Sequence, residues 1–292
     1  MAIGNFDGLH IGHQRIIKRA QKLAEKKNAA CAVFTFQNHP LSVINQRLEP
    51  EHIYSRGERN DILSALKVDI LIEVAFTAEL AQKKPGDFVR LLQESVSPDS
   101  IVVGENFTFG AGAEGNAESL KNILSGFGCF VDVVRLVYYD GVQVSSTFIR
   151  QLIRDGDLPR IKCFSGRDYL FYGKVVHGEK RGRTIGFPTA NFAIEPGRAM
   201  LPDGVYAVKA EVNSIMLYGL ANIGRNPTFG SAERRLEVHL LNFSADIYGS
   251  MVRISFIEKL REEEKFDSAE ALLEQIKADK SHAEKIFSVR NF

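Results

Sequence analysis

Apolar residues in the first half of the chain occur in short continuous runs that alternate with amphipathic stretches. A short apolar run is typical of a strand buried on both faces, whereas apolar residues three or four positions apart are typical of a helix. Strands are predicted over residues 30–36, 69–76, 100–104 and 130–137. Helices are predicted after Gly12 and over residues 59–66 and 88–92. Because strands separated by helices form parallel sheets, the pattern predicts an α/β fold with a Rossmann-like parallel sheet.

After about residue 157 the pattern changes to short strands with no helical spacing between them. These strands are predicted over residues 169–177, 204–212, 216–223, 235–243 and 251–257. Such an arrangement is typical of an antiparallel β-barrel or sandwich. A closing helix follows, with Asp267 as its expected N-cap and Glu270 as the capping-box partner. We therefore expect two domains: residues 1–157 with the parallel sheet, and residues 158–292 with an antiparallel β-barrel and a closing helix.

The composition is that of an ordinary globular protein, with 45% hydrophobic and 25% charged residues. A formal net charge of +1 gives no general attraction to nucleic acid or to a membrane, so neither is expected as a partner. Three cysteines without a CxxC pair favour buried thiols over a disulfide framework. No signal peptide or membrane span is expected from the apolar pattern, which indicates a cytoplasmic protein and leaves self-association open.

A first group of candidate residues lies between a very short strand and the first helix, in Gly4-Asn5-Phe6-Asp7-Gly8-Leu9-His10-Ile11-Gly12-His13. Open parallel sheets bind ligands at the carboxyl ends of their strands, where the next helix offers free N–H groups to phosphate. His10 and His13 are three residues apart, so both can face one ligand. The alternative is a glycine-rich turn with two surface histidines, and two histidines alone make an incomplete zinc site. The nucleotide-binding candidates here are Gly4, Phe6, Asp7, Gly8 and Gly12.

A second group, Val144-Ser145-Ser146-Thr147-Phe148-Ile149-Arg150, places three hydroxyl groups ahead of a predicted helix. Ser145, Ser146 and Thr147 can bind phosphate oxygens together with the N–H groups of that helix. Arg150 can neutralise charge that develops in a transition state. The alternative is an ordinary helix N-cap followed by an arginine exposed to solvent.

A third group runs from a strand at Gly173 through a glycine-rich basic loop to Gly186-Phe187-Pro188-Thr189-Ala190-Asn191. Residues 178–184 do not form a P-loop, because the spacing is one residue short, Arg183 replaces the lysine and no helix follows. A flexible surface loop with solvated basic side chains is the alternative interpretation.

In order along the chain, these segments resemble a known family. The first two groups, together with the segments 36–40 (FQNHP) and 103–110 (VGENFTFG), resemble the FAD synthetase part of the bacterial bifunctional riboflavin kinase/FAD synthetase family. The third group, with segments 222–229 (NIGRNPTF) and 236–243 (LEVHLLNF), resembles its riboflavin kinase part. The hexapeptide GFPTAN is the most specific element, and the resemblance spans nearly the whole chain.

For the N-terminal half, the resemblance implies that the phosphate of FMN attacks the α-phosphorus of ATP and expels pyrophosphate. His10 and His13 would bind the ATP phosphates and stabilise the charged transition state. Ser145, Ser146 and Arg150 would close over the triphosphate. Asn106 would help to hold the flavin.

For the C-terminal half, the resemblance implies that the 5′-hydroxyl of riboflavin attacks the γ-phosphorus of ATP. Glu237 is the candidate general base, with an outward-facing strand glutamate as the alternative. Thr189 and Asn191 would bind Mg²⁺ and phosphate through oxygen atoms. The remaining candidates are three residues of the loop over the nucleotide and one residue that meets flavin or phosphate: Gly178, Gly182, Arg183 and Arg261.

The chain departs from the family pattern at two places that bear on flavin affinity. Residues 38–40 are Asn-His-Pro where Pro-His-Pro is usual, and residues 75–77 are Ala-Phe-Thr where Pro-Phe-Asp is frequent. Three hypotheses remain. The first is a bifunctional enzyme that uses ATP, riboflavin and FMN with Mg²⁺, the second is an enzyme with one active half, and the third is a flavin-binding regulator without turnover.

Overall fold

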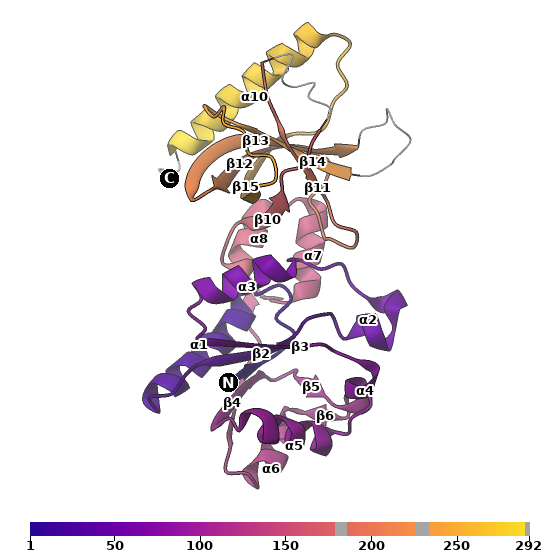
Figure 1. Ribbon diagram of the computed structural model, residues 1–292, viewed down its shortest axis with the longest axis vertical. Coiled ribbons are helices and arrows are strands. Elements are labelled where there is room, and N and C mark those ends of the chain that lie inside the picture. Colours follow the sequence, from indigo (N-terminus) through magenta and orange to yellow (C-terminus); the bar gives the residue numbers. More distant parts are fainter. Residues whose placement is uncertain (179–185, 226–233, 290–292) are drawn as a thin grey trace. The chain divides into compact units, whose positions relative to one another are not determined.

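The computed structural model describes residues 1–178, 186–225 and 234–289. The chain divides into two compact units, Met1–Ile149 and Arg150–Phe292 (Figure 1). The first is an α/β domain and the second is built on antiparallel strands, so the predicted fold class is confirmed. The boundary predicted after residue 157 coincides with the start of α8 (Leu158–Ser165) and stays a prediction.

A five-stranded parallel sheet forms the centre of the N-terminal unit, with strand order β3-β2-β1-β4-β7. Its strands are β1 (Ala2–Ile3), β2 (Ala32–Phe36), β3 (Ile70–Val74), β4 (Ser100–Gly104) and β7 (Phe130–Val134). The strands predicted over residues 69–76 and 130–137 are longer than β3 and β7. Phe76, Leu136 and Val137 lie beyond the ends of these strands and line a cavity instead. Their apolar character is thus explained by the cavity rather than by strand pairing.

Helices and two short hairpins surround this sheet. The helices are α1 (Ile11–Lys26), α2 (Leu41–Ile44), α3 (Arg56–Ala65), α4 (Ala78–Ala81), α5 (Pro85–Val96) and α6 (Ala117–Ser125). A further helix, α7 (Ser146–Asp155), contains the division between the two units. The hairpins pair β5 (Thr108–Phe109) with β6 (Gly115–Asn116) and β8 (Tyr138–Tyr139) with β9 (Val142–Gln143). Short 3₁₀ turns cover Gln46–Leu48 and Ala111–Ala113.

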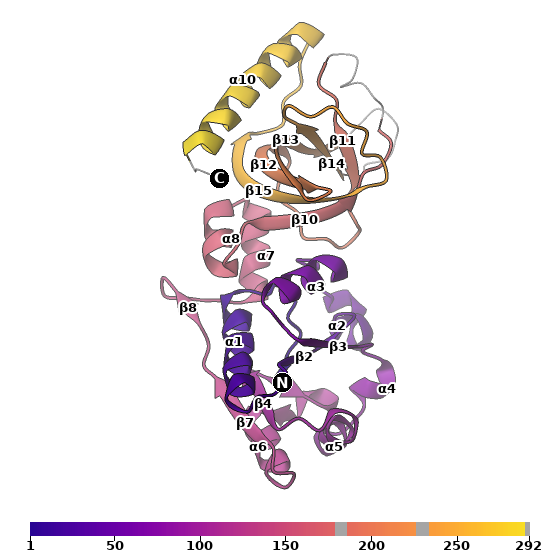
Figure 2. The same ribbon diagram turned by 60° about the vertical axis from the view of Figure 1, so that its left-hand side comes forward.

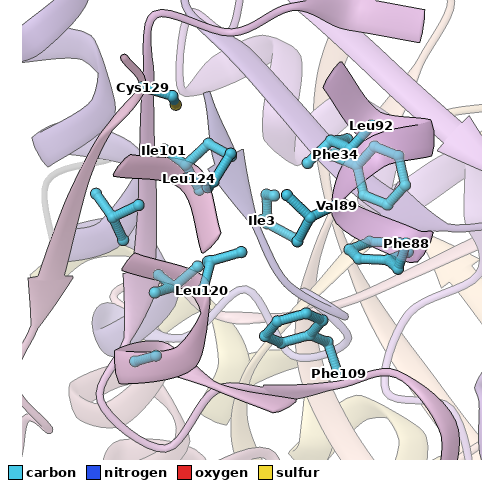
Figure 3. Packing of buried hydrophobic residues seen from close by; sticks show 13 residues of the cluster. Ile3, Phe34, Phe88, Val89, Leu92, Ile101, Phe109, Leu120, Leu124 and Cys129 are labelled. Atoms are coloured by element: carbon cyan, nitrogen blue, oxygen red, sulfur yellow. The ribbon is translucent and has the colours of Figure 1, made fainter. Parts of the chain in front are cut away.

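Both faces of the sheet are buried. Ile101 and Val103 of β4 face a core that α5 and α6 supply with Phe88, Leu92 and Leu120 among others (Figure 3). Val102, which points to the other face, is also 0% exposed, and α1 packs against β4. A strand covered on both sides must be apolar at every position, which is why the sequence shows continuous runs here.

An ion-pair cluster fastens α3 to β3. The helix begins with a capping box in which the Ser55 hydroxyl and the Glu58 carboxylate bond each other's backbone N–H groups. Arg56 and Arg59 then donate to the carboxylate of Glu73 on β3, at 2.9 and 2.6 Å. Burial opposes ionisation of Glu73, but the hydrogen bonds from the two arginines outweigh it, so the pKa of Glu73 lies below its ordinary value.

The C-terminal unit is a six-stranded antiparallel sheet that curves into a partly closed barrel (Figure 2). Its strands are β10 (Tyr169–Lys174), β11 (Ala190–Ala193), β12 (Gly204–Val212), β13 (Ile215–Arg225), β14 (Arg234–Leu240) and β15 (Met251–Arg261), in the order β10-β15-β12-β13-β14-β11. The two edges meet where Val176 pairs with Asn191, and the Val176 N–H donates to the Asn191 carbonyl at 2.8 Å. The sequence pattern missed β11, which begins with the last two residues of the GFPTAN segment, Ala190 and Asn191.

The closing helix α10 (Ala269–Val289) packs on the outer face of the barrel. Its Ala283 and Phe287 contact Ala207 of β12 and Leu220 of β13. The expected N-cap, Asp267, is wrong: the Ser268 hydroxyl accepts the Ala271 N–H at 3.1 Å, one residue later along the chain. Glu270 consequently falls at the second helical position, too early for a capping box. No helix among the described residues has the length and apolar composition that a bilayer span requires.

We predict that Glu73→Gln destabilises the N-terminal unit by about 3 kcal/mol, because it leaves the buried Arg59 guanidinium without its charge partner. The matched control is Glu79→Gln, since the exposed Glu79–Lys83 pair is 3.7 Å apart and contributes less than about 1 kcal/mol. Urea unfolding followed by circular dichroism measures both. Glu73 has a lowered pKa when folded, so its contribution is present above its ordinary pKa and is lost as the pH falls through the folded-state value. Equal midpoints for the two variants, or a gap that widens in acid, would contradict this account.

Candidate functional site

A cavity of about 920 Å³ lies at the carboxyl edge of the parallel sheet. Every strand supplies a lining residue at or just beyond its last position, namely Gly4, Phe36, Phe76, Gly104 and Arg135 for β1, β2, β3, β4 and β7. The strand order reverses direction beside β1, and open α/β sheets bind ligands at such a reversal. The volume is at the upper end of the range for small-molecule sites, which suits a large ligand or a pair of ligands.

The turn between β1 and α1 is held in a strained conformation. Phe6 and Leu9 have φ angles of 45° and 40°, a left-handed backbone that costs a non-glycine residue on the order of 1–3 kcal/mol. Both side chains are 0% exposed, so their packing offsets the strain. Gly12 matters for a different reason: a Cβ there would lie 3.1 Å from the ring of His10, so a larger residue would press on that ring. The turn and its glycine therefore fix where His10 sits.

The two histidines form one unit at the start of α1. Their rings stack with centroids 3.7 Å apart and planes inclined by 14°. Nδ1 of His10 accepts the backbone N–H of His13 at 3.2 Å, so Nε2 is the nitrogen of His10 that is able to donate. Both rings line the cavity, beside helix N–H groups and the positive end of the α1 dipole. This end of the cavity is built to receive an anion.

An aromatic wall lines another part of the same cavity, formed by Phe36, Phe76, Phe88, Phe107 and Phe109. Phe36 and Phe76 meet edge to face at 5.0 Å, and Phe107 and Phe109 stack at 5.6 Å. None of the described residues that line the cavity is an aspartate or a glutamate. The cavity thus combines an anion-binding turn with a surface suited to a flat aromatic ring.

Most residues predicted for this site line the cavity: Gly4, Phe6, His10, Gly12, His13, Asn106, Ser145 and Ser146. Asp7, Gly8 and Thr147 are not among its lining residues. Gly8 packs against a lining residue, since a Cβ at Gly8 would lie 3.2 Å from the Ser146 hydroxyl oxygen. The Ser145 hydroxyl accepts the Phe148 N–H at 3.2 Å, so the N-cap proposed as the alternative is present in the same residue that lines the cavity.

Two arginines bear on this site in different ways. Arg150 lies on α7 just past the division between the units and is 6% exposed, so it is not the solvated arginine of the alternative interpretation. Its catalytic role stays a prediction. Arg135 lines the cavity and was missed by the sequence analysis, which placed it inside a longer strand. A prediction that ended the strand at Val134 would have placed Arg135 at the carboxyl edge of the sheet, where ligands bind.

In the C-terminal unit, strand pairing sets polar residues side by side. Glu237 of β14 pairs with Asn191 of β11 on one side and with Asn222 of β13 on the other. Asn222 pairs in turn with Val205, and Val205 pairs with Arg261 of β15. Paired residues share a face of the sheet, so the predicted base, metal ligand and flavin-binding residue belong to a single row. Leu236 and Val238 point into the barrel, which places this row on the outer face.

The GFPTAN segment is held against this row. The Thr189 hydroxyl donates to the Glu237 carboxylate at 3.4 Å, and the Asn191 side chain donates to the Thr189 carbonyl at 3.4 Å. His239, two residues from Glu237 on the same face, has its Nδ1 2.9 Å from the Pro188 carbonyl. Its ring also meets Phe187 edge to face at 5.1 Å. Thr189, Asn191 and Glu237 are therefore brought together, as the resemblance implies.

The other predicted residues of this half have different positions. Gly178 lies so close to Asn191 that a Cβ would be 2.3 Å from its Nδ2 atom, so only glycine fits. Gly182 and Arg183 lie outside the described residues. Arg261 makes a two-pronged ion pair with Asp279 of α10 at 3.1 and 3.0 Å, which holds its guanidinium against the helix. Its role in flavin binding stays a prediction.

Asn222 is the residue of this row that the sequence analysis did not single out. Its Oδ1 atom is buried and has no hydrogen-bond partner among the described residues. A buried amide oxygen without a partner is unusual in a folded protein. The alternation of faces along residues 216–223 shows which residues share a face with Asn222. Only the register with β14 shows that Asn222 lies beside Glu237.

The chain is similar to known proteins both in its two domains and over its whole length. The family model for FAD synthetase matches residues 1–148, and the family model for riboflavin kinase matches residues 165–287. A crystal structure from Streptococcus pneumoniae, described as a macrolide-efflux protein, is similar with a TM-score of 0.87 and 34% identity. The similarity covers 97% of this chain and 93% of that chain.

Three relatives bear the name bifunctional riboflavin kinase/FMN adenylyltransferase. The protein of Bacillus subtilis is 36% identical over 99% of this chain and 92% of its own length. Those of Haemophilus influenzae and Escherichia coli K12 are 35% and 34% identical over 99% of this chain, and 94% and 93% of their own lengths. With both family models matched and full-length relatives above 30% identity, the chain belongs to the bifunctional riboflavin kinase/FMN adenylyltransferase family.

Proposed function

We propose that the cavity of the N-terminal unit is where FMN is adenylylated and that the Glu237 row of the C-terminal unit is where riboflavin is phosphorylated. Membership of the family supplies the two activities, and the assignment of each to its site rests on the geometry. We place the division between the activities after residue 157. The observation that carries the first assignment is the presence of an anion-binding turn and an aromatic wall in one cavity.

In the N-terminal site, FMN and ATP bind with the FMN phosphate directed at the α-phosphorus of ATP. His10 and His13 donate hydrogen bonds to phosphate oxygens, and the N-terminus of α1 adds its N–H groups. Ser145, Ser146 and Arg150 bind the departing pyrophosphate. Asn106 and the phenylalanines bind the flavin. Catalysis of this kind is positioning and charge stabilisation, and it needs no covalent nucleophile.

In the C-terminal site, Glu237 accepts the proton of the riboflavin 5′-hydroxyl as that oxygen attacks the γ-phosphorus of ATP. The carboxylate already accepts a hydrogen bond from Thr189, so it is oriented before substrate arrives. We expect Gly178 to contribute to nucleotide binding, and the same role is expected of Gly182 and Arg183, which lie outside the described residues. Arg261 contributes at the flavin end through its fixed position beside Asp279.

Mg²⁺ fits the donor set of the kinase site. The Thr189 hydroxyl, the Asn191 amide oxygen and the Glu237 carboxylate are oxygen donors, which Mg²⁺ prefers, and its remaining positions are commonly filled by water and substrate phosphate. We therefore expect Thr189 and Asn191 to hold it. When bound, Mg²⁺ neutralises charge on the ATP phosphates.

The expected cellular location and partners of the protein follow from its substrates. ATP, riboflavin and FMN are cytoplasmic metabolites in this proposal, so we expect a cytoplasmic enzyme without a nucleic-acid or membrane partner. Self-association is left as an outcome of sizing experiments on the whole chain.

We predict that incubation with riboflavin, ATP and Mg²⁺ yields FMN and then FAD, separated by chromatography. FMN alone would support an enzyme with only the C-terminal half active. Neither product, with flavin still bound, would support a binding protein without turnover and would overturn the proposal.

We predict that two substitutions separate the activities. Glu237→Gln removes the proton acceptor and lowers FMN formation by roughly 10²–10⁴-fold, while FAD formation from added FMN is unchanged. His13→Ala removes a phosphate-binding donor and lowers FAD formation by roughly 10²–10³-fold, while FMN formation is unchanged. The activity that each variant retains shows that the other unit of its chain is still folded. A folded variant that loses both activities would show that the division of roles is wrong.

We predict that Gly178→Ala lowers the kinase rate by roughly a hundredfold, because the added Cβ displaces the side chain of Asn191 and small misplacements of positioning groups have effects of this size. Gly86→Ala is the matched control, since a Cβ there has nothing within 4 Å. Initial rates of FMN formation measure both. An active Gly178→Ala enzyme would mean that Asn191 does not need its observed position.

A further inference from the structure

The loop after β2 and the loop after β3 are joined by the side chain of Asn38. Its Oδ1 accepts the backbone N–H of Phe76 at 2.9 Å, and its Nδ2 donates to the Phe76 carbonyl at 3.1 Å. Nδ2 also donates to the Ser42 hydroxyl at 3.2 Å. The side-chain amide thus acts both as a donor and as an acceptor, and these partners fix its orientation.

This contact continues the sheet beyond the end of its strands. The pairing of β2 with β3 ends at Phe36 and Val74, after which the Gln37 N–H still donates to the Val74 carbonyl at 3.0 Å. At the next position the side-chain amide of Asn38 takes the place of a backbone amide, because it carries the same donor and acceptor.

The two joined loops form one wall of the N-terminal cavity. Pro40 and the α2 residues Val43 and Ile44 line it on the side of the first loop, while Phe76 and the α4 residue Leu80 line it on the side of the second. The Phe76 ring also packs edge to face on Phe36 at 5.0 Å. Asn38 is half-buried and is not itself a lining residue, so it acts on the cavity through Phe76.

We propose that Asn38 is a positioning residue for FMN, which holds the Phe76 wall in place before the flavin binds. This rests on the proposed function, in which the cavity binds FMN and ATP. A wall that is ordered beforehand loses less freedom on binding, which improves affinity. Among the described residues the hydrogen bonds of the Asn38 side chain go to Phe76 and Ser42 and not to the phosphate-binding turn at His10, so Asn38 affects the binding of flavin and not the transfer step.

The test is the kinetics of FAD formation by the full-length chain with Asn38→Ala. The KM for FMN rises by about tenfold, the size expected for two lost hydrogen bonds, while kcat and the KM for ATP change by less than about twofold. Riboflavin kinase activity, carried by the other unit of the same chain, stays at the wild-type level and reports on the concentration of enzyme, while thermal unfolding followed by circular dichroism reports on folding of the N-terminal unit. Gln37→Ala is the matched control: its Nε2 donates to the Glu73 carbonyl at 3.3 Å, but its side chain is exposed and does not line the cavity.

A second variant decides the case if the alanine variant is unstable. Asn38→Asp keeps the acceptor for the Phe76 N–H but replaces the donor to the Phe76 carbonyl by a repelling oxygen, so the KM for FMN rises again. An unchanged KM for FMN in a folded Asn38 variant, or a fall in kcat without a change in KM, overturns the role of Asn38. Wild-type enzyme that makes no FAD overturns the proposed function instead, so the two failures are distinguishable.

Discussion

The N-terminal site depends on the pairing of a two-residue strand. Ala2 and Ile3 pair with β2, and Ala2 pairs with β4, which puts β1 at the centre of the parallel sheet. The Gly4 N–H donates to the Phe34 carbonyl at 3.2 Å and delivers the chain to the carboxyl edge. From there only a tight, partly left-handed turn reaches the start of α1. The buried rings and chains of Phe6 and Leu9 stabilise that turn, and the histidine pair is seated as a result.

The C-terminal site depends on strand register in the same way. Residues alternate between the faces of a strand, so a slip of β14 by one position would turn Glu237 into the barrel and Val238 out of it. The outer face is shared: α10 covers Ala207 and Leu220, and the neighbouring row along the same face carries Asn222 and Glu237. On the outer face of the barrel, α10 therefore covers the apolar residues, and the polar row with Asn222 and Glu237 lies next to them.

The sequence predicted the parts of the fold that repeat and missed those that depend on single contacts. Continuous apolar runs located β2, β4 and β12 nearly to the residue, because burial on one or both faces leaves a periodic signal. β11 and the closure of the barrel at Val176 and Asn191 left none, because a short strand beside a proline follows from its partners and not from its own pattern. The ordered motifs supplied the candidate residues of both sites, whose roles stay predictions. Arg135 and Asn222 escaped, since their places are set by where a strand ends and by which strand lies beside it.

In the proposed function, the two sites would balance the negative charge of ATP in opposite ways. The described lining of the N-terminal cavity has two histidines and Arg135 but no carboxylate, so the protein's own groups and the α1 dipole attract the anion. The Glu237 row has a carboxylate at its centre, as the proposed kinase reaction requires, because an alcohol must lose a proton there while the phosphate of FMN is already ionised. A carboxylate beside a triphosphate is repulsive unless a cation stands between them. The chemistry of the nucleophile thus explains why one site is lined by donors and the other by oxygen ligands.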